Sequence, residues 1–186
     1  MTGRIERLRK EYKINIRWVA FPLRPETPEE GTIMEKLFLE RGADPVVIQS
    51  RLEQAAREEG LPFGRREKTY NSRLAQELGK WAESKGKGDQ FHDALFRTCL
   101  VEGLNIGKVS VLVEVARSLG LPQEEAAEVL ETRAFKKSVD LDWTRSQMMQ
   151  VQAIPTLVIN EAFLVGAQKY EKMAQFMRAN NIKERE

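Results

Sequence analysis

The chain is poor in the residue types that build cross-linked or metal-bound structure. Its 186 residues include one cysteine, Cys99, and one histidine, His92. Within these residues an internal disulfide, a cysteine-based metal site and a histidine-rich metal cluster are therefore excluded. We accordingly expect no metal ion, and any redox chemistry would have to use a thiol other than a cysteine pair of this chain.

Long apolar runs and an excess of one charge are also missing. No stretch reaches the roughly 18 apolar residues that a membrane-spanning helix needs. Thirty basic and 28 acidic residues leave a net charge of +2, without the basic stripe typical of nucleic-acid-binding proteins. The opening residues, MTGRIERLRKEYK, lack the apolar core of a signal peptide. We therefore expect a cytoplasmic protein that binds neither membrane nor nucleic acid.

What the chain does contain is hydrophobic periodicity of two kinds. GRIERLRKEY predicts an amphipathic helix, and KINIRWVAFPL alternates as a strand does, with one face formed by Ile14, Ile16, Trp18 and Ala20. From about residue 33 to residue 150 the period is helical. At the end of the chain TLVIN and FLVG predict two strands joined at Glu161 and Ala162, and AQKYEKMAQFMRAN predicts a final helix.

Neither Cys99 nor His92 has the sequence surroundings of a reactive group. Cys99 lies among apolar residues and is interpreted as a small core hydrophobe, because a reactive thiolate needs a helix N-terminus or nearby cations. His92 has no neighbour in sequence that would orient it as a general base. It is interpreted as a partly buried or surface histidine.

Two short motifs near the end of the chain have both an ordinary and a functional interpretation. In QAIPTLVIN, Pro155 opens a strand and removes a ladder donor there. By base rates the Ile154–Pro155 bond would be trans. In VGAQKYE, Gly166 ends a strand while Ala167 and Gln168 open a helix, whose free N–H groups favour an anion. An ordinary strand-to-helix turn is the alternative.

Taken together, these segments resemble the DsbA-like group of the thioredoxin superfamily. RWVAFPLRPETPEEG resembles the family's strand and following loop, and YNSRLAQELGKWAE resembles the start of its inserted helical domain. AIPTLVINEAFLVGAQKYE resembles its cis-proline strand and the turn after the hairpin. The turn Gly166-Ala167-Gln168 is most similar to the FrnE-like branch, which is related to 2-hydroxychromene-2-carboxylate isomerase and kappa-class glutathione transferase.

The resemblance implies an α/β thioredoxin-like fold interrupted by a large all-helical insertion. Residues 1–28 and 150–186 would form a discontinuous thioredoxin-like domain, and residues 29–149 the helical insertion domain. The family's first strand and its Cys-x-x-Cys motif have no counterpart in this sequence. With the first strand missing, the sheet would expose an edge. We expect a partner chain to cover that edge, for example in a homodimer.

The resemblance also implies a function. It points to a thiol–disulfide oxidoreductase or isomerase, truncated or without its own active-site dithiol, whose catalytic residues are not identified. A cis bond at Ile154–Pro155 would present the Ile154 backbone to an extended thiol substrate. Asn71, Ala167 and Gln168 would complete the substrate- or glutathione-binding site, although Asn71 could equally cap a helix.

Two alternatives share the same fold. One is a glutathione-dependent isomerase or transferase, in which glutathione supplies the thiol that the chain lacks. The other is a non-catalytic module that binds glutathione or an extended peptide. In each case the expected partner is a thiol-containing small molecule or an extended peptide, and glutathione is the possible cofactor.

Overall fold

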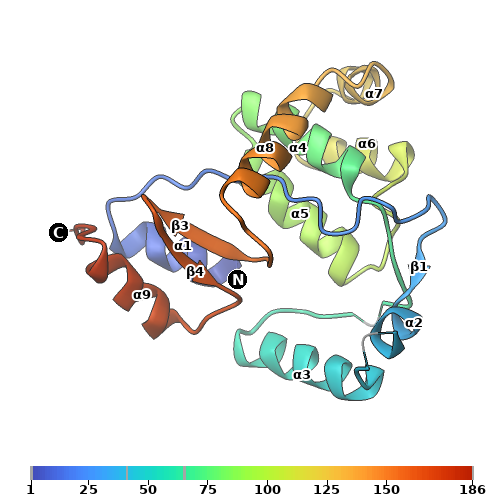
Figure 1. Ribbon diagram of the computed structural model, residues 1–186. Coiled ribbons are helices and arrows are strands. Elements are labelled where there is room, and N and C mark those ends of the chain that lie inside the picture. Colours follow the sequence, from blue (N-terminus) through green and yellow to red (C-terminus); the bar gives the residue numbers. More distant parts are fainter. Residues whose placement is uncertain (1, 41, 65, 186) are drawn as a thin grey trace. The chain divides into compact units, whose positions relative to one another are not determined.

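The computed structural model describes residues 2–40, 42–64 and 66–185 (Figure 1). The chain divides into two compact units. The discontinuous unit comprises Met1–Leu23 and Leu141–Glu186, and the helical unit comprises Arg24–Asp140. The sequence-based expectation set these limits at 28/29 and at 149/150.

The discontinuous unit combines a small sheet with two helices. Strands β3 (Thr156–Ile159) and β4 (Ala162–Val165) form an antiparallel hairpin, and helices α1 (Thr2–Glu11) and α9 (Tyr170–Ala179) contact each other (Figure 1). The first helix, the hairpin and the final helix are thus confirmed. Leu157, Ile159 and Leu164 pack against a core cluster of buried residues: Ile5, Leu8, Tyr12, Met173, Ala174 and Met177.

The turn of the hairpin lies one residue earlier than predicted. Ile159 pairs with Ala162, so the two connecting residues are Asn160 and Glu161, and Ala162 already belongs to β4. Asn160 has φ 54°, a left-handed conformation that asparagine tolerates better than most residues. The position that needs a positive φ therefore determines where the turn falls.

Residues 13–22 run without forming a strand, which corrects the strand predicted there. Their burial still alternates as the pattern predicts, with Ile14, Ile16 and Trp18 half-buried between exposed neighbours. A strand also needs a ladder partner, and within the described residues only the single bridge between Tyr12 and Glu184 adjoins this segment. The hydrophobic pattern therefore predicted the faces of the segment correctly but not its pairing.

Helix α8 (Lys136–Met148) supplies one hydrogen bond to this segment. The Asp142 side chain is 2% exposed, and its Oδ2 accepts the N–H of Ala20 at 2.9 Å. Its other oxygen, Oδ1, lies 3.5 Å from Arg17 Nη2. A buried carboxylate thus satisfies one backbone donor that a neighbouring strand would otherwise take.

The helical unit confirms the helical period predicted for residues 33–150. Its helices are α2 (Met34–Leu39), α3 (Pro45–Glu58), α4 (Arg73–Ser84), α5 (Gly88–Leu100), α6 (Val109–Ser118), α7 (Gln123–Glu131) and the first residues of α8. A short antiparallel pair, β1 (Thr32–Ile33) with β2 (Lys68–Thr69), was not predicted. The unit's core lies on α4, whose buried Leu78 and Trp81 pack with Phe91 of α5 and Leu112 of α6.

One charged side chain lies inside this helical core. Glu77 of α4 is fully buried and accepts hydrogen bonds from Arg73 Nε (2.6 Å) and from Arg133 Nε and Nη2 (2.7 Å each). Burial alone would raise the pKa of Glu77, but the hydrogen bonds from Arg133 and Arg73 outweigh it and hold the pKa below its ordinary value of 4.5. Arg73 also bonds Asp140 Oδ1 at 2.7 Å. The network joins α4 to the loop after α7 and to α8.

We predict that Glu77→Gln destabilises the protein by about 3 kcal/mol at neutral pH. This is near the low end for a broken buried ion pair, because Arg133 keeps some access to water. Urea denaturation followed by circular dichroism measures the change. The matched control is Glu114→Gln, since Glu114 pairs with Arg117 on the exposed surface of α6 and its loss should cost at most ~1 kcal/mol.

The stabilities of wild type and Glu77→Gln should also depend differently on pH. Because the pKa of Glu77 is lower in the folded than in the unfolded protein, its carboxylate stabilises the fold above the unfolded-state pKa. That contribution is lost as the pH falls through the folded-state pKa. The stability difference between wild type and Glu77→Gln should therefore narrow below about pH 4. A difference that stays constant from neutral to acid pH would contradict the proposed ion pairing.

Residues 13–22, which form no strand, give a second prediction. Within the described chain, the backbone N–H groups of Asn15, Ile16 and Val19 have no hydrogen-bond partner. In a dilute monomer these amides should exchange with solvent far faster than the buried amides of α4. If a second copy covers residues 13–22 in a homodimer, the protection of these amides should rise with protein concentration. Strong protection in the dilute monomer would show that the edge is already covered and would contradict the expectation.

Candidate functional site

The Ile154–Pro155 peptide lies immediately before β3, and its peptide bond is cis. The N–H of Gly166 donates to the Pro155 carbonyl at 2.8 Å, which extends the hairpin ladder by one pair. Ile154 is 45% exposed, and among the described residues its own N–H and carbonyl have no hydrogen-bond partner. Ile154 therefore offers one donor and one acceptor to an extended ligand.

The pairing of β3 determines where the remaining backbone groups point. In an antiparallel ladder alternate residues bond to the same partner strand, so Pro155, Leu157 and Ile159 face β4. Thr156 and Val158 direct their N–H and carbonyl groups to the opposite side, as Ile154 does. We call this side the open edge of β3, defined by Ile154, Thr156 and Val158.

One face of the hairpin beside the open edge is apolar and exposed. Val158 pairs across the sheet with Phe163, and these side chains are 37% and 43% exposed. Val165, on the same strand face as Phe163, is 51% exposed. A ligand that pairs with the open edge would thus also find apolar contact area beside its own side chains.

The turn after β4 is held by hydrogen bonds from the side chain and the backbone of Gln168 and from Arg4. Gly166 has φ +87°, a conformation that disfavours residues with a side chain. The side-chain amide of Gln168 donates to the Val165 carbonyl at 2.6 Å, and its backbone N–H donates to the Gly166 carbonyl at 2.9 Å. From α1, Arg4 Nη1 donates to the carbonyls of Ala167 (3.3 Å) and Gln168 (2.6 Å).

Arg4 contacts this corner, and sequence reasoning did not predict that contact. It lies next to the buried stripe of α1, but its two acceptors follow 163 and 164 residues later in the chain. No local pattern reports a contact across that separation. The structure therefore adds Arg4 to the four predicted residues of this corner: Ile154, Pro155, Ala167 and Gln168.

Asn71 lies in the helical unit, and its side chain is engaged within that unit. Its amide donates to the carbonyls of Pro25 (2.9 Å) and Thr27 (3.0 Å), while Oδ1 accepts the N–H of Arg73 (2.9 Å). These bonds cap the start of α4 and fasten the loop at residues 25–27. A ligand would have to replace them in order to use the Asn71 amide.

Cys99 and His92 both lie on α5, in the helical unit. Cys99 is half-buried against the core, as expected, yet Arg66 Nη1 donates to its sulfur at 3.3 Å, a cation that the local sequence did not suggest. His92 Nε2 lies 3.8 Å from Glu83 Oε1 of α4. Burial opposes ionisation of Glu83, but the nearby His92 and Lys80 side chains outweigh it and lower the pKa of Glu83.

In the parts of the chain that the structure describes, no three acidic, cysteine or histidine side chains gather as a metal ion requires. Over the same residues, no helix combines the length and the apolar character needed to cross a membrane.

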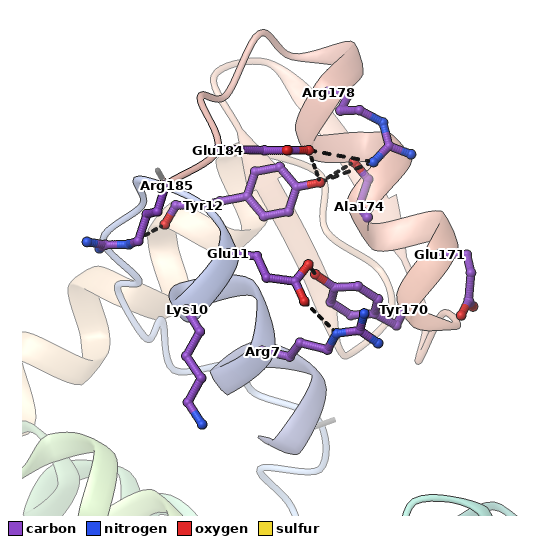
Figure 2. A pocket seen from close by; sticks show the side chains of 10 residues that line it. All are labelled: Arg7, Lys10, Glu11, Tyr12, Tyr170, Glu171, Ala174, Arg178, Glu184 and Arg185. Atoms are coloured by element: carbon purple, nitrogen blue, oxygen red, sulfur yellow. Dashed lines mark hydrogen bonds and ion pairs between the residues drawn. The ribbon is translucent and has the colours of Figure 1, made fainter.

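A cavity of about 570 Å³ lies on the discontinuous unit between α1, α9 and the end of the chain (Figure 2). Its lining includes none of the predicted site residues. Arg7 Nε lies 2.7 Å from Glu11 Oε1, the Tyr170 hydroxyl donates to the other Glu11 oxygen, and the Arg7 guanidinium stacks 3.7 Å above the Tyr170 ring. Burial and the neighbouring Glu11 carboxylate raise the pKa of Tyr170 to about 12. These groups bond one another and so join α1 to α9.

Comparison with known proteins accounts for this architecture. The model of the DSBA-like thioredoxin domain matches residues 1–178. Among curated proteins, the uncharacterized protein YwbO of Bacillus subtilis (strain 168) is 27% identical over 100 residues, which are 50% of this chain and 48% of that protein. The match thus spans about half the length of that relative.

Two solved structures share the fold. A probable DsbA oxidoreductase from Streptomyces coelicolor superposes with a TM-score of 0.87 at 22% identity, over 96% of this chain and 82% of that one. A 2-hydroxychromene-2-carboxylate isomerase gives a TM-score of 0.72 at 17% identity, over 97% and 86% of the two chains. The thioredoxin-like fold predicted from the sequence is confirmed, and with a family match over nearly its whole length the chain belongs to the DSBA-like thioredoxin domain family.

Proposed function

We propose that the protein is a FrnE-like thiol–disulfide oxidoreductase or isomerase whose described residues bind the substrate but do not supply the reactive thiol. The observation that carries the proposal is the open edge of β3 at Ile154, in a chain of the DSBA-like family. An extended peptide or glutathione would pair its backbone with the N–H and carbonyl of Ile154. The exposed Val158 and Phe163 favour a ligand with apolar side chains next to its sulfur.

The chemistry requires a thiol from outside the described site. In thiol–disulfide exchange a thiolate attacks one sulfur of a disulfide, forms a mixed disulfide and releases the other sulfur as a thiolate. The single cysteine of the sequence, Cys99, lies near the C-terminal end of α5 and not at a helix N-terminus, where thiolates are stabilised. Glutathione bound at Ile154 would supply the missing sulfur.

A glutathione-dependent isomerase or transferase is the second candidate. The single cysteine favours it, because such an enzyme uses the glutathione sulfur as its nucleophile and needs no cysteine pair. A non-catalytic module that binds glutathione or an extended peptide is the third candidate. All three use the same backbone groups, so binding and turnover must be measured separately.

Binding is tested by titrating the protein with reduced glutathione and recording amide resonances by NMR. We expect saturable shifts at Ile154, Thr156 and Val158, which define the open edge. Ile154→Pro removes the N–H donor while it keeps the carbonyl acceptor, and it should weaken binding about five- to tenfold, since one hydrogen bond contributes roughly 1 kcal/mol. The matched control is Ile154→Ala, which keeps the donor and should bind within about threefold of wild type.

Turnover is measured next, as the exchange of glutathione with a low-molecular-weight disulfide and, separately, as glutathione-dependent isomerisation. Exchange accelerated by wild type and slowed in Ile154→Pro supports the oxidoreductase, and isomerisation alone supports the second candidate. Saturable binding without either activity supports the binding module. If glutathione and an extended apolar thiol peptide both fail to shift the open-edge amides, the proposed site is wrong.

A further inference from the structure

We propose that Arg4 is a positioning residue for ligand binding at Ile154, which it reaches through the turn at residues 166–168. The identity of the ligand rests on the proposed function, whereas the structural coupling between Arg4 and Ile154 does not depend on it. It assigns to the first helix a role in the binding site that neither the family match nor the similar structures describe.

The Arg4 guanidinium bonds two successive residues of the turn. Arg4 is half-buried in the first turn of α1, and its Nη1 donates to the carbonyls of both Ala167 and Gln168. Hydrogen bonds from a charged donor are stronger than neutral ones, and the 2.6 Å contact with Gln168 is short for its kind. Arg4 therefore fixes two successive peptide units of the turn between β4 and α9.

From Gln168 a series of hydrogen bonds leads to the Ile154–Pro155 peptide. The Gln168 N–H donates to the Gly166 carbonyl at 2.9 Å, and the Gly166 N–H donates to the Pro155 carbonyl at 2.8 Å. The Gln168 side-chain amide donates to the Val165 carbonyl at 2.6 Å, so the turn is also bonded to the end of β4. Pro155 is covalently joined to Ile154, whose backbone groups pair with the ligand in the proposed function.

The consequence is geometric. Backbone hydrogen bonds between strands weaken steeply once the donor–acceptor distance or angle departs from the usual range. A turn released from Arg4 is free to shift relative to α1, and Pro155 would move with Gly166. The Ile154 groups would then meet an extended ligand in poorer geometry, although Arg4 itself need not touch that ligand.

The test compares Arg4→Ala and Arg4→Lys with wild type. A lysine amine carries several N–H donors and can bond the same two carbonyls, so it should restore what alanine removes. Lys10→Ala is the matched control, because Lys10 is exposed on the same helix and its loss changes the net charge equally. The readouts are the amide resonances of Ile154 and residues 166–168 without ligand, and the dissociation constant for reduced glutathione.

We expect Arg4→Ala to move the resonances of both Ile154 and the turn, and to weaken glutathione binding about tenfold. Arg4→Lys should recover most of both effects, and Lys10→Ala should show neither. An unchanged Ile154 resonance in Arg4→Ala, or weaker binding without that change, would overturn the proposal. So would a failure of lysine to restore an effect that alanine produces.

Two further measurements cover the cases in which Arg4→Ala does not fold or wild type does not bind glutathione. If Arg4→Ala unfolds, Gln168→Ala serves instead, because it removes only the bond to Val165 and should still move the Ile154 resonance. An unmoved resonance in that variant overturns the proposal. If wild type does not bind glutathione, the proposed function fails, yet the ligand-free Ile154 resonance still decides whether Arg4 is coupled to the binding peptide.

Discussion

Backbone hydrogen bonding in the β3–β4 hairpin is the constraint on which the proposed site depends. Each residue of a strand can direct its N–H and carbonyl to only one side, and β4 takes every second residue of β3. The residues between them, including Ile154, are therefore left with backbone groups that the hairpin cannot use. Among the described residues, the lack of a partner for the Ile154 N–H and carbonyl thus follows from strand geometry and requires no special side chain at Ile154.

Polar side chains fasten the rest of the structure where ladders are missing. Asp142 accepts the N–H of Ala20 in segment 13–22, which forms no strand, and Asn71 holds the loop at residues 25–27. Asn105 does the same for the Glu29 carbonyl, while Glu77 receives three guanidinium bonds inside the helical core. Of these side chains Asp142 and Glu77 are buried, and buried polar groups stabilise a fold only when they are paired. Several are joined to partners far away in the sequence.

Sequence periodicity predicted most of the fold, because amphipathic patterns report which face of a local element is buried. It placed the helices of residues 33–150, the C-terminal hairpin and the final helix, and it predicted the alternating faces of residues 13–22. It did not predict that this last segment forms no strand, since a ladder depends on a second strand that the segment itself does not encode. It misplaced the hairpin turn by one residue because Asn160, not Ala162, tolerates a positive φ.

The site was predictable only in part, for the same physical reason. The motifs around Pro155 and Gly166 predicted a site at the corner where the structure has the cis peptide and the turn at residues 166–168, and its binding role stays a prediction. The contacts of Arg4 with that corner, and of Arg66 with Cys99, cross long sequence separations and leave no local pattern. Asn71 shows the opposite case, because a residue assigned to a ligand spends both of its amide donors on backbone carbonyls of its own unit.

The side-chain amide of Gln168 has a further consequence for self-association. By occupying the Val165 carbonyl, it removes an acceptor from the outer edge of β4, while the opposite edge of the hairpin stays available. Open-ended stacking of sheets requires two competent edges on every molecule, whereas one competent edge closes after a single addition. The hairpin is thus asymmetric as a template: strand addition at the β4 edge would lack one backbone acceptor, whereas Ile154, Thr156 and Val158 keep theirs at the open edge of β3.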